Sequence, residues 1–391
     1  MRPGATVVVE GARIAHVGFD GARVDDAEVH DLGGKALLPG LIDAHVHVTA
    51  VDHDPLKLAA MPPSLITARA KEVLEGMLGR GFTSVRDAAG ADFGLREALE
   101  RGYLKGPRLF IAGQPLSQTG GHGDVRPRGA QDMYCTCAGL GLFGAIADGV
   151  DAVRKAAREQ LRNGADQVKV MASGGILSPT DPVHATQYSL EELRAVCEEA
   201  QAHGTYVMAH AYSPAAITRA VQSGVRSIEH GNLLDEKAAK VMKEHGAFLV
   251  PTLATYAAFG DASVFPDRAP LLRAKLQQVQ SQGIRAVAIA KAEGIPIAFG
   301  TDLLGEMHRL QSTEFALRLP AMTPAEILRS ATSVAAELLG QSGKIGVVAP
   351  GAFADLLVVE GDPTRDTAPL QAPERGLRAV MKDGRFYLNR L

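Results

Sequence analysis

The sequence predicts an α/β protein: a (β/α)8 barrel with a small β-sandwich domain formed from both ends of the chain. Eight short apolar runs rich in β-forming residues follow one another between residues 41 and 302. Segments with the helical spacing of apolar residues separate these runs. Alternating strands and helices form parallel sheets, and eight parallel strands close a barrel, so the pattern favours the barrel. A doubly wound open sheet is the alternative fold.

Both ends of the chain carry short strands that bury little apolar surface alone. The segment "TVVVEGARIAHVG" predicts two strands around Glu10-Gly11, and "AVMKDGRFYL" predicts a hairpin on Asp383-Gly384. Two such pieces gain stability by packing together, because an isolated hairpin is marginal in water. We therefore expect a composite β domain of residues 1–38 plus 345–391, and a barrel of residues 39–344.

The expected barrel strands are residues 41–48, 82–88, 108–113, 167–172, 206–212, 227–230, 248–255 and 295–302. Two intervening helices carry clear boundary signals. The segment 189–204 has a Ser N-cap, a Glu at the capping-box offset and a Gly stop, and 323–340 has a Thr cap, a Pro at the first position and a Gly stop. The connection 114–147 holds seven glycines. Loops this long are usually functional or disordered, so we expect it to lie over the barrel mouth.

Composition argues against several classes of partner. Lys and Arg number 41 against 44 Asp and Glu, a net charge of -3, so a nucleic-acid partner is not expected. No apolar run approaches the roughly 18 residues of a membrane helix, and the first residues lack signal-peptide features, so we expect a cytoplasmic protein that does not bind membranes. The three cysteines, Cys135, Cys137 and Cys197, are too few for a disulfide framework or a cysteine zinc site, and are expected to be reduced.

Ionisable residues stand at the carboxyl ends of five expected strands, where barrel enzymes place their chemistry. His45 and His47 are two apart in "LIDAHVHV", so strand alternation points both to one side. They are metal ligands or, alternatively, hydrogen-bonded core histidines. Imidazole and carboxylate ligands suit zinc and similar divalent ions. The other strand-end residues are Lys169, His210, His230 and Asp302.

Lys169 lies within the apolar run "QVKVMA". A buried ammonium loses several kcal/mol of hydration unless it is paired, so one interpretation is a lysine paired with an acid inside the barrel. The other is a neutral amine, since burial lowers the pKa of lysine. A neutral amine can add carbon dioxide, and the carbamate that forms has two oxygens able to bridge two metal ions.

These motifs together resemble the amidohydrolase superfamily. They are "PGLIDAHVH", "QVKVMASGG", "HAYSPAAITRAV", "SIEHG", "FGTD" and "GKIGVVAPGAFADLLVVEGDP", in family order across nearly the whole chain. The resemblance implies two divalent ions, with zinc expected. In it, His45, His47 and Asp302 hold the more buried ion, His210 and His230 hold the other, and carboxylated Lys169 bridges them.

Within the superfamily the chain is most similar to metal-dependent prolidases and Xaa-amino-acid carboxypeptidases, through "TGGHGD" and the "HAY…AITRA" run. This similarity implies that His122 contacts the scissile carbonyl, and that Tyr212 and Arg219 bind the terminal carboxylate of the substrate. It also implies attack by a metal-bridging hydroxide, with Asp302 relaying the proton to the leaving amine and His122 stabilising the oxyanion.

The expected function is hydrolysis of the amide bond of dipeptides or N-acyl amino acids that carry a free carboxylate. A cyclic-amide hydrolase or a base deaminase of the same superfamily is the alternative, since such an enzyme needs a pocket for a ring. A barrel that has lost its metals is the non-enzymatic alternative. The similarity also implies a homo-oligomer.

Overall fold

A computed structural model describes residues 4–19, 21, 25–126, 128–129, 141–178, 180–264 and 270–391. Cys135 and Cys137 lie outside the described residues, as does part of the connection 114–147. Cys197 is buried with a free thiol, as expected. No helix among the described residues is long and apolar enough to cross a membrane.

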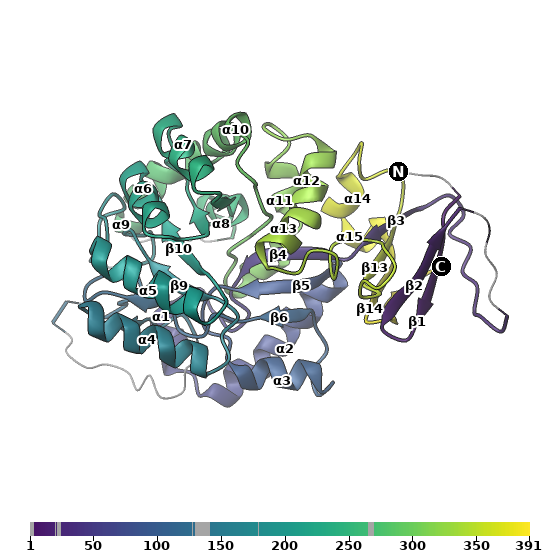
Figure 1. The fold of residues 1–391 in the computed structure, drawn as a ribbon, viewed down its shortest axis with the longest axis horizontal. Helices are drawn as coiled ribbons and strands as arrows, with labels where there is room; N and C mark the ends of the chain where they lie inside the picture. The colour runs from purple at the N-terminus through teal and green to yellow at the C-terminus, as the bar shows by residue number, and fades with distance from the viewer. Residues whose placement is uncertain are drawn as a thin grey trace.

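Parallel strands form the centre of the molecule, with helices outside them (Figure 1). One sheet has the order β4-β5-β6 and the other the order β12-β11-β10-β9-β7-β8. The strands of the two sheets are β4 (Leu41–Val46), β5 (Phe82–Asp87), β6 (Arg108–Phe110), β7 (Leu116–Ser117), β8 (Ala145–Ile146), β9 (Val168–Met171), β10 (Val207–Ala211), β11 (Ser227–His230) and β12 (Phe248–Val250).

The predicted eighth strand, residues 295–302, is a chain segment that joins the two sheets. Ile297 forms an isolated parallel bridge with Leu249 of β12. On its other side the Ala44 N–H of β4 donates to the carbonyl of Phe299 at 2.7 Å. The segment therefore takes the place of an eighth strand between β12 and β4, which confirms the (β/α)8 arrangement while leaving this position less regular than predicted.

Helices follow the strands and cover the sheets from outside. The long amphipathic ones bury one apolar side against the strands. The helices of the described residues are α1 (Pro55–Ala60), α2 (Pro63–Gly79), α3 (Phe93–Glu100), α4 (Val150–Arg162), α5 (Leu190–Ala202), α6 (Pro214–Gln222), α7 (Glu236–Glu244), α8 (Leu253–Gly260), α9 (Pro270–Val279), α10 (Gly283–Glu293), α11 (Thr313–Leu317), α12 (Pro324–Ser330), α13 (Ser333–Leu338), α14 (Ala368–Gln371) and α15 (Pro373–Gly376). Short 3-10 helices occupy Gln280–Gln282 and Gly305–Leu310.

The two predicted helices with boundary signals had different outcomes. Helix α5 begins with the predicted capping box of Ser189 and Glu192. The segment 323–340 also begins with a capping box, but the single predicted helix is wrong, because it divides into α12 and α13. The break lies at Ala331, whose carbonyl accepts a hydrogen bond from the Ile42 N–H of β4 at 2.7 Å. A carbonyl held by the barrel in this way favours ending the helix.

The predicted strand 248–255 is also wrong beyond its first three residues. Strand β12 ends at Val250, and Thr252 has a left-handed backbone with φ of 46°. A β-branched residue rarely adopts this conformation, which turns the chain sharply. Helix α8 then begins at Leu253.

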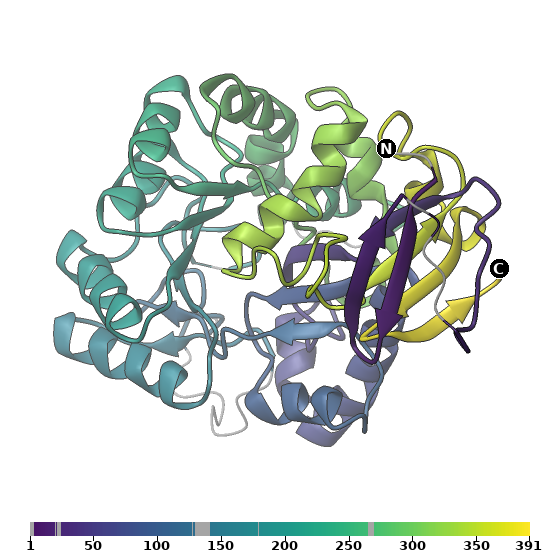
Figure 2. The ribbon, with the colours of Figure 1, turned by 45° about the vertical axis from the view of Figure 1, so that its right-hand side comes forward.

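Strands from both ends of the chain form a second, antiparallel layer beside the barrel (Figure 2). Here β3 (Ala36–Pro39), β13 (Leu356–Val359), β14 (Leu377–Lys382) and β15 (Arg385–Asn389) make one sheet, and the hairpin of β1 (Thr6–Glu10) and β2 (Arg13–Gly18) packs on it through Ile14, Ala354 and Leu356. Both predicted hairpins are confirmed. The exact division at residues 38 and 345 stays a prediction.

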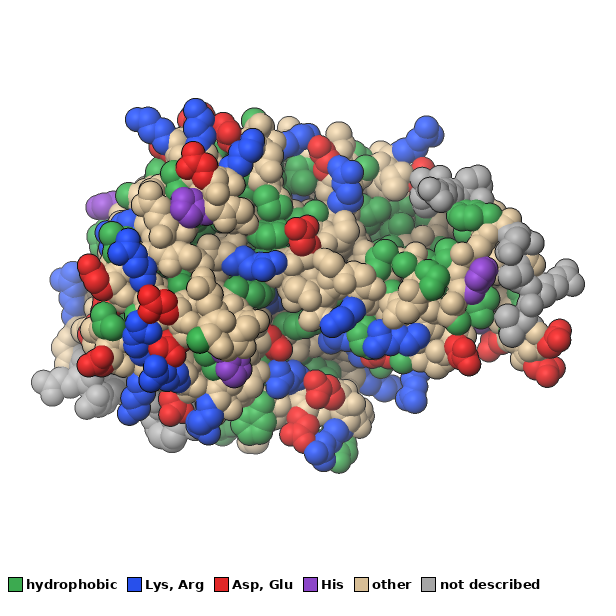
Figure 3. Space-filling view, viewed as in Figure 1, with side chains coloured by type: hydrophobic (Ala, Val, Ile, Leu, Met, Phe, Trp, Pro, Cys, Tyr) green, Lys and Arg blue, Asp and Glu red, His purple; other side chains and the backbone are tan. Residues whose placement is uncertain are grey.

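Charged side chains of both signs are interspersed on the face of the molecule shown in Figure 3. No single-sign patch dominates that face. This distribution agrees with the small net charge of the whole chain.

Candidate active site

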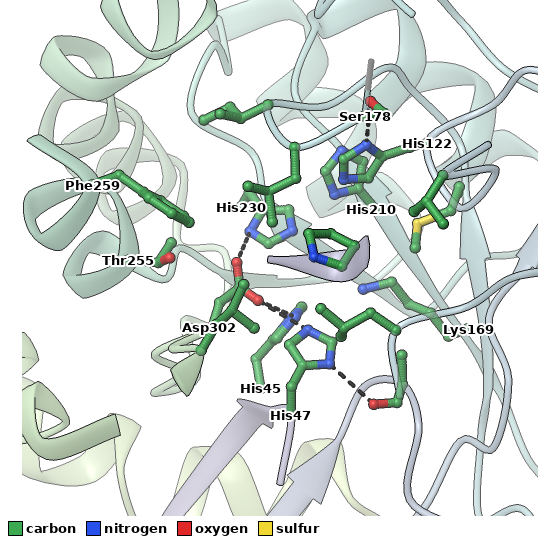
Figure 4. A pocket seen from close by; sticks show the side chains of 18 of the residues that line it. His45, His47, His122, Lys169, Ser178, His210, His230, Thr255, Phe259 and Asp302 are labelled. Atoms are coloured by element: carbon green, nitrogen blue, oxygen red, sulfur yellow. Dashed lines mark hydrogen bonds and ion pairs between the residues drawn. The ribbon is translucent and has the colours of Figure 1, made fainter. Parts of the chain in front are cut away.

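A pocket at the carboxyl ends of the barrel strands brings together most of the predicted site residues (Figure 4). They come from β4, β9, β10, β11 or the residues that directly follow these strands, the connection between β7 and β8, and the segment that follows residue 295. The pocket is otherwise mainly apolar. Its lining includes His45, His47, His122, Lys169, His210, Tyr212, His230 and Asp302.

Two histidines and one carboxylate form the tightest group in this pocket. Asp302 Oδ1 lies 3.0 Å from His47 Nε2 and 3.4 Å from His45 Nε2. One ligand atom from each of the three residues lies within 4.8 Å of the others. These are the three residues that the resemblance to amidohydrolases implied for the more buried ion.

A buried ion pair contacts His45 at its Nδ1 side. Glu229 Oε2 accepts the His45 Nδ1–H at 2.6 Å, and the same carboxylate accepts from Arg86 at 2.9 Å and from Ser227. The side chains of Arg86, Glu229 and His45 have no exposed surface. Burial by itself would raise the pKa of Glu229, but the Arg86 guanidinium and the hydrogen bond from His45 outweigh it and lower the pKa to about 2.

The group fits a divalent metal ion. The His45 Nδ1–H donates to the Glu229 carboxylate, so Nε2 of the neutral ring carries a lone pair, and that buried Nε2 has no hydrogen-bond partner. The Nδ1 of His47 is occupied by the carbonyl of Ala89 at 3.2 Å, so its Nε2 is the nitrogen directed at Asp302. Lone pairs and a carboxylate that face one another are satisfied by a cation.

Lys169, His210 and His230 lie beside this group. The ring centroids of His45 and His230 are 5.0 Å apart, and those of His210 and His230 are 4.6 Å apart. His230 Nδ1 contacts Thr252 Oγ1 at 2.8 Å, whereas His210 Nε2 lies 3.2 Å from the Gly174 carbonyl. Within the described part of the chain, only His45, His47 and Asp302 converge closely enough to form a three-ligand cluster of unmodified side chains.

Lys169 is buried without a carboxylate of the described chain paired directly to it. Its side chain is 2% exposed, and no carboxylate of the described residues lies within 4.0 Å of its Nζ. Burial lowers the pKa of Lys169 to about 8. The alternative of a lysine in a direct ion pair inside the barrel is therefore not what the described residues form.

His122 lies on the opposite side of the pocket from His45. Its ring stacks on that of His210, with centroids 4.3 Å apart, and its Nδ1 lies 2.8 Å from Ser178 Oγ. Burial lowers the pKa of His122 to about 4, so its ring is neutral near pH 7. Nearby, Tyr256 donates to the Tyr212 hydroxyl at 2.9 Å, and burial raises the pKa of Tyr212.

Arg219 is not brought to the other predicted residues. It lies on α6, and its guanidinium donates to the Tyr188 carbonyl at 2.7 Å. Arg219 does not line the pocket, and no other arginine of the described residues does. The predicted pairing of Arg219 with Tyr212 at a substrate carboxylate is therefore not preformed.

Sequence reasoning missed several supporting residues. Arg86 and Glu229 each left a signal, because a charged residue within a short apolar strand requires a buried partner. Tyr256 was missed because it lies just beyond the predicted strand 248–255, in helix α8, which was not predicted. Ser178 carried no signal in the sequence.

Comparison with known proteins identifies the class. Residues 36–386 match the amidohydrolase family, so the chain belongs to that family and is a hydrolytic enzyme. It is 34% identical over 367 residues to ochratoxinase of Aspergillus niger, covering 90% of this chain and 75% of that protein. It is also 30% identical over 380 residues to imidazolonepropionase of Deinococcus radiodurans, covering 93% and 87%.

Solved structures agree with the predicted fold and family. A prolidase complexed with N-methylphosphonate-L-proline is 47% identical, with a TM-score of 0.95 over 98% of this chain and 95% of that one. A Xaa-Pro dipeptidase with bound methionine is 30% identical, with a TM-score of 0.88 over 98% and 95%. The predicted similarity to prolidases is confirmed.

Proposed function

We propose that this amidohydrolase cleaves the amide bond of dipeptides or N-acyl amino acids that carry a free C-terminal carboxylate. The observation that carries the proposal is the buried group of His45, His47 and Asp302, whose acceptor atoms converge in the pocket. The 47% identity to a prolidase bound to an L-proline phosphonate supports this substrate class.

In the proposal, His45, His47 and Asp302 would hold one divalent ion, and His210 and His230 would hold a second. Carboxylated Lys169 would be a further ligand, and zinc is the expected metal. When bound, such ions supply an acidified water and a polarised substrate carbonyl. The unpaired, buried state of Lys169 supports the carbamate, since only a neutral amine adds carbon dioxide.

In the proposal, two residues of the chain act directly on the reacting groups during hydrolysis. Asp302 reaches into the pocket with 19% of its side chain exposed, so it is placed to accept the proton of the attacking water and pass it to the leaving nitrogen. His122 lines the same pocket and is our candidate for the residue that contacts the scissile carbonyl.

Tyr212 is our candidate for the substrate carboxylate. Tyr256 donates to the Tyr212 oxygen, so the Tyr212 O–H is left for a ligand. Arg219, the second residue predicted for this role, would have to leave the Tyr188 carbonyl to join it. A pocket without a lining arginine among the described residues favours the cyclic-amide hydrolase as second candidate, because a ring substrate needs no carboxylate partner.

A matrix of enzymes and substrates tests the proposal. We expect wild type to cleave N-acetyl-L-proline or Gly-L-Pro about 10- to 100-fold more efficiently than the corresponding C-terminal amides, because a charge-assisted contact is lost with the amide. Tyr212→Phe should lower kcat/KM on the acid relative to wild type, and should change kcat/KM on the amide little. Equal activity of wild type on acid and amide would refute the carboxylate role.

Arg219→Met completes the matrix. A loss of kcat/KM on the acid as large as that of Tyr212→Phe would restore Arg219 as a carboxylate partner, and wild-type kcat/KM would remove it from the site.

We also propose that the enzyme is a cytoplasmic homo-oligomer acting on small molecules alone. Sedimentation velocity of the purified protein tests the assembly.

A further inference from the structure

A hydrogen-bonded chain behind His122 connects the loop after β9 with helix α9. Ser178 Oγ lies 2.8 Å from His122 Nδ1 and also hydrogen-bonds to Asp181 Oδ1. Gln187 also connects His122 with Asp181. Its Oε1 accepts the His122 backbone N–H at 2.9 Å, and its Nε2 donates to Asp181 at 2.8 Å. Asp181, Ser178 and Gln187 are all at most 5% exposed.

Lys275 of α9 also contacts the loop after β9. Its Nζ donates to the carbonyls of Gly175 and Ser178 at 2.8 and 2.7 Å, and lies 3.6 Å from Asp181 Oδ1. A lysine on one element that holds two carbonyls and a carboxylate of another makes the loop conformation specific. The loop therefore presents Ser178 to His122 in a defined position.

The His122 ring is closely packed on both of its faces. One face stacks on His210, with ring centroids 4.3 Å apart. On the Gly175 side, an added Cβ would lie 2.0 Å from His122 Cε1, which no side chain can do without displacing the ring. The position thus requires glycine because of close approach, and the ring has little freedom to turn.

The directions of the hydrogen bonds follow from proton counting. A carboxylate only accepts, so the single Ser178 hydroxyl proton goes to Asp181. Ser178 Oγ must then accept from His122, which places the ring proton on Nδ1. Nε2 is left as the one ring nitrogen available to the pocket.

We propose that Ser178 and Asp181 are positioning residues that fix the ring and the Nδ1–H tautomer of His122, with Lys275 holding their loop in place. The proposal rests on the proposed function only for the role of His122 toward the substrate carbonyl. Whether Nε2 accepts a proton or, once protonated, donates to an oxyanion, it must face the scissile bond. Misplacement of a catalytic group by about 1 Å lowers rates by about 100-fold.

The first test reads the tautomer directly, without activity. In zinc-loaded protein labelled with 13C and 15N histidine, the His122 resonances are assigned by their absence in His122→Gln. We expect the Nδ1–H form in wild type near pH 7.5. Asp181→Asn lets the amide donate to Ser178, so Ser178 can donate to His122 and the Nε2–H form should appear. A wild-type Nε2–H tautomer would overturn the proposal.

The second test is a double-mutant cycle on hydrolysis. Ser178→Ala should lower kcat about 10- to 100-fold with little change in KM, while the exposed control Ser64→Ala stays at the wild-type rate. In a His122→Ala background, Ser178→Ala should have no further effect. An equal loss in both backgrounds would show that Ser178 acts other than through His122 and would refute its positioning role.

The two failures are distinguishable. A wild-type enzyme that cleaves no dipeptide or N-acyl amino acid would remove the proposed function but leave the tautomer measurement intact. A wild-type rate for His122→Ala would remove the assignment of His122 to the carbonyl. Should Ser178→Ala unfold the loop, Lys275→Met with normal metal content and thermal stability gives the same comparison from the other side of the network.

Discussion

Glu229→Gln tests whether the ion pair behind His45 supports both the fold and the metal site. Glutamine has the shape of glutamate but lacks the negative charge, and this charge is what Arg86 and His45 contact in wild type. Arg86 is then left unpaired with none of its surface exposed. Removing one partner of a buried pair costs about 3–5 kcal/mol, and disturbing the group that orients a metal-binding histidine weakens metal affinity about 10- to 100-fold.

Urea unfolding in the presence of a chelator measures the first effect, and zinc competition against a chromophoric chelator measures the second. The control is Glu236→Gln, since Glu236 lies 3.8 Å from Arg285 in an exposed pair and should change stability by less than about 0.5 kcal/mol. Adding Arg86→Met to Glu229→Gln should recover part of the loss, because no charge then remains unpaired.

The pH dependence of this pair has a defined sign. The folded-state pKa of Glu229 is about 2, below its ordinary 4.5, so the pair stabilises the protein fully above about pH 4.5 and loses that effect as the pH falls toward 2. The difference between wild type and Glu229→Gln should therefore shrink in acid. A variant within about 1 kcal/mol of wild type at pH 7, with unchanged zinc affinity, would refute the reasoning.

Three further predictions follow from the site and its supports. Purified enzyme should hold about two divalent ions per chain by elemental analysis and lose activity on chelation, so full activity with a single ion would contradict the binuclear proposal. Lys169→Ala should lose most activity and the second ion, and short-chain carboxylic acids should restore part of both. An unmodified Lys169 in density with two ions present would exclude the carbamate. Thr323→Ala removes the N-cap of α12 and should cost about 1 kcal/mol in urea unfolding with kcat unchanged, and a loss of kcat would show that the helix does more than support the barrel.

The convergence of the candidate metal ligands could be predicted from the sequence because most of them stand at or near strand ends. In a parallel barrel all strand ends meet at one face, so a local pattern is enough to bring His45, His210 and Asp302 together. The capping boxes and the two hairpins were predictable for the same reason, since each depends on residues within a few positions of one another.

What the sequence did not predict depends on distant contacts. Ser178 is joined to His122, 56 residues away, and Lys275 reaches it from 97 residues further along the chain. The division of residues 323–340 into two helices depends on β4, through the Ala331 carbonyl. The position of Arg219 depends on Tyr188, whose carbonyl holds the guanidinium. None of these partners is visible in a local pattern.

The active site is also where the backbone departs most from ordinary geometry. Among the described residues, six other than glycine have positive φ, and His230, Thr252 and Asp302 are three of them, at 72°, 46° and 55°. Such conformations cost about 1–3 kcal/mol each and persist only where surrounding contacts maintain them. The Asp302 N–H is held by the His45 carbonyl at 2.9 Å, and Thr252 Oγ1 contacts His230 at 2.8 Å. Contacts with neighbouring residues at the carboxyl ends of the strands therefore maintain these conformations.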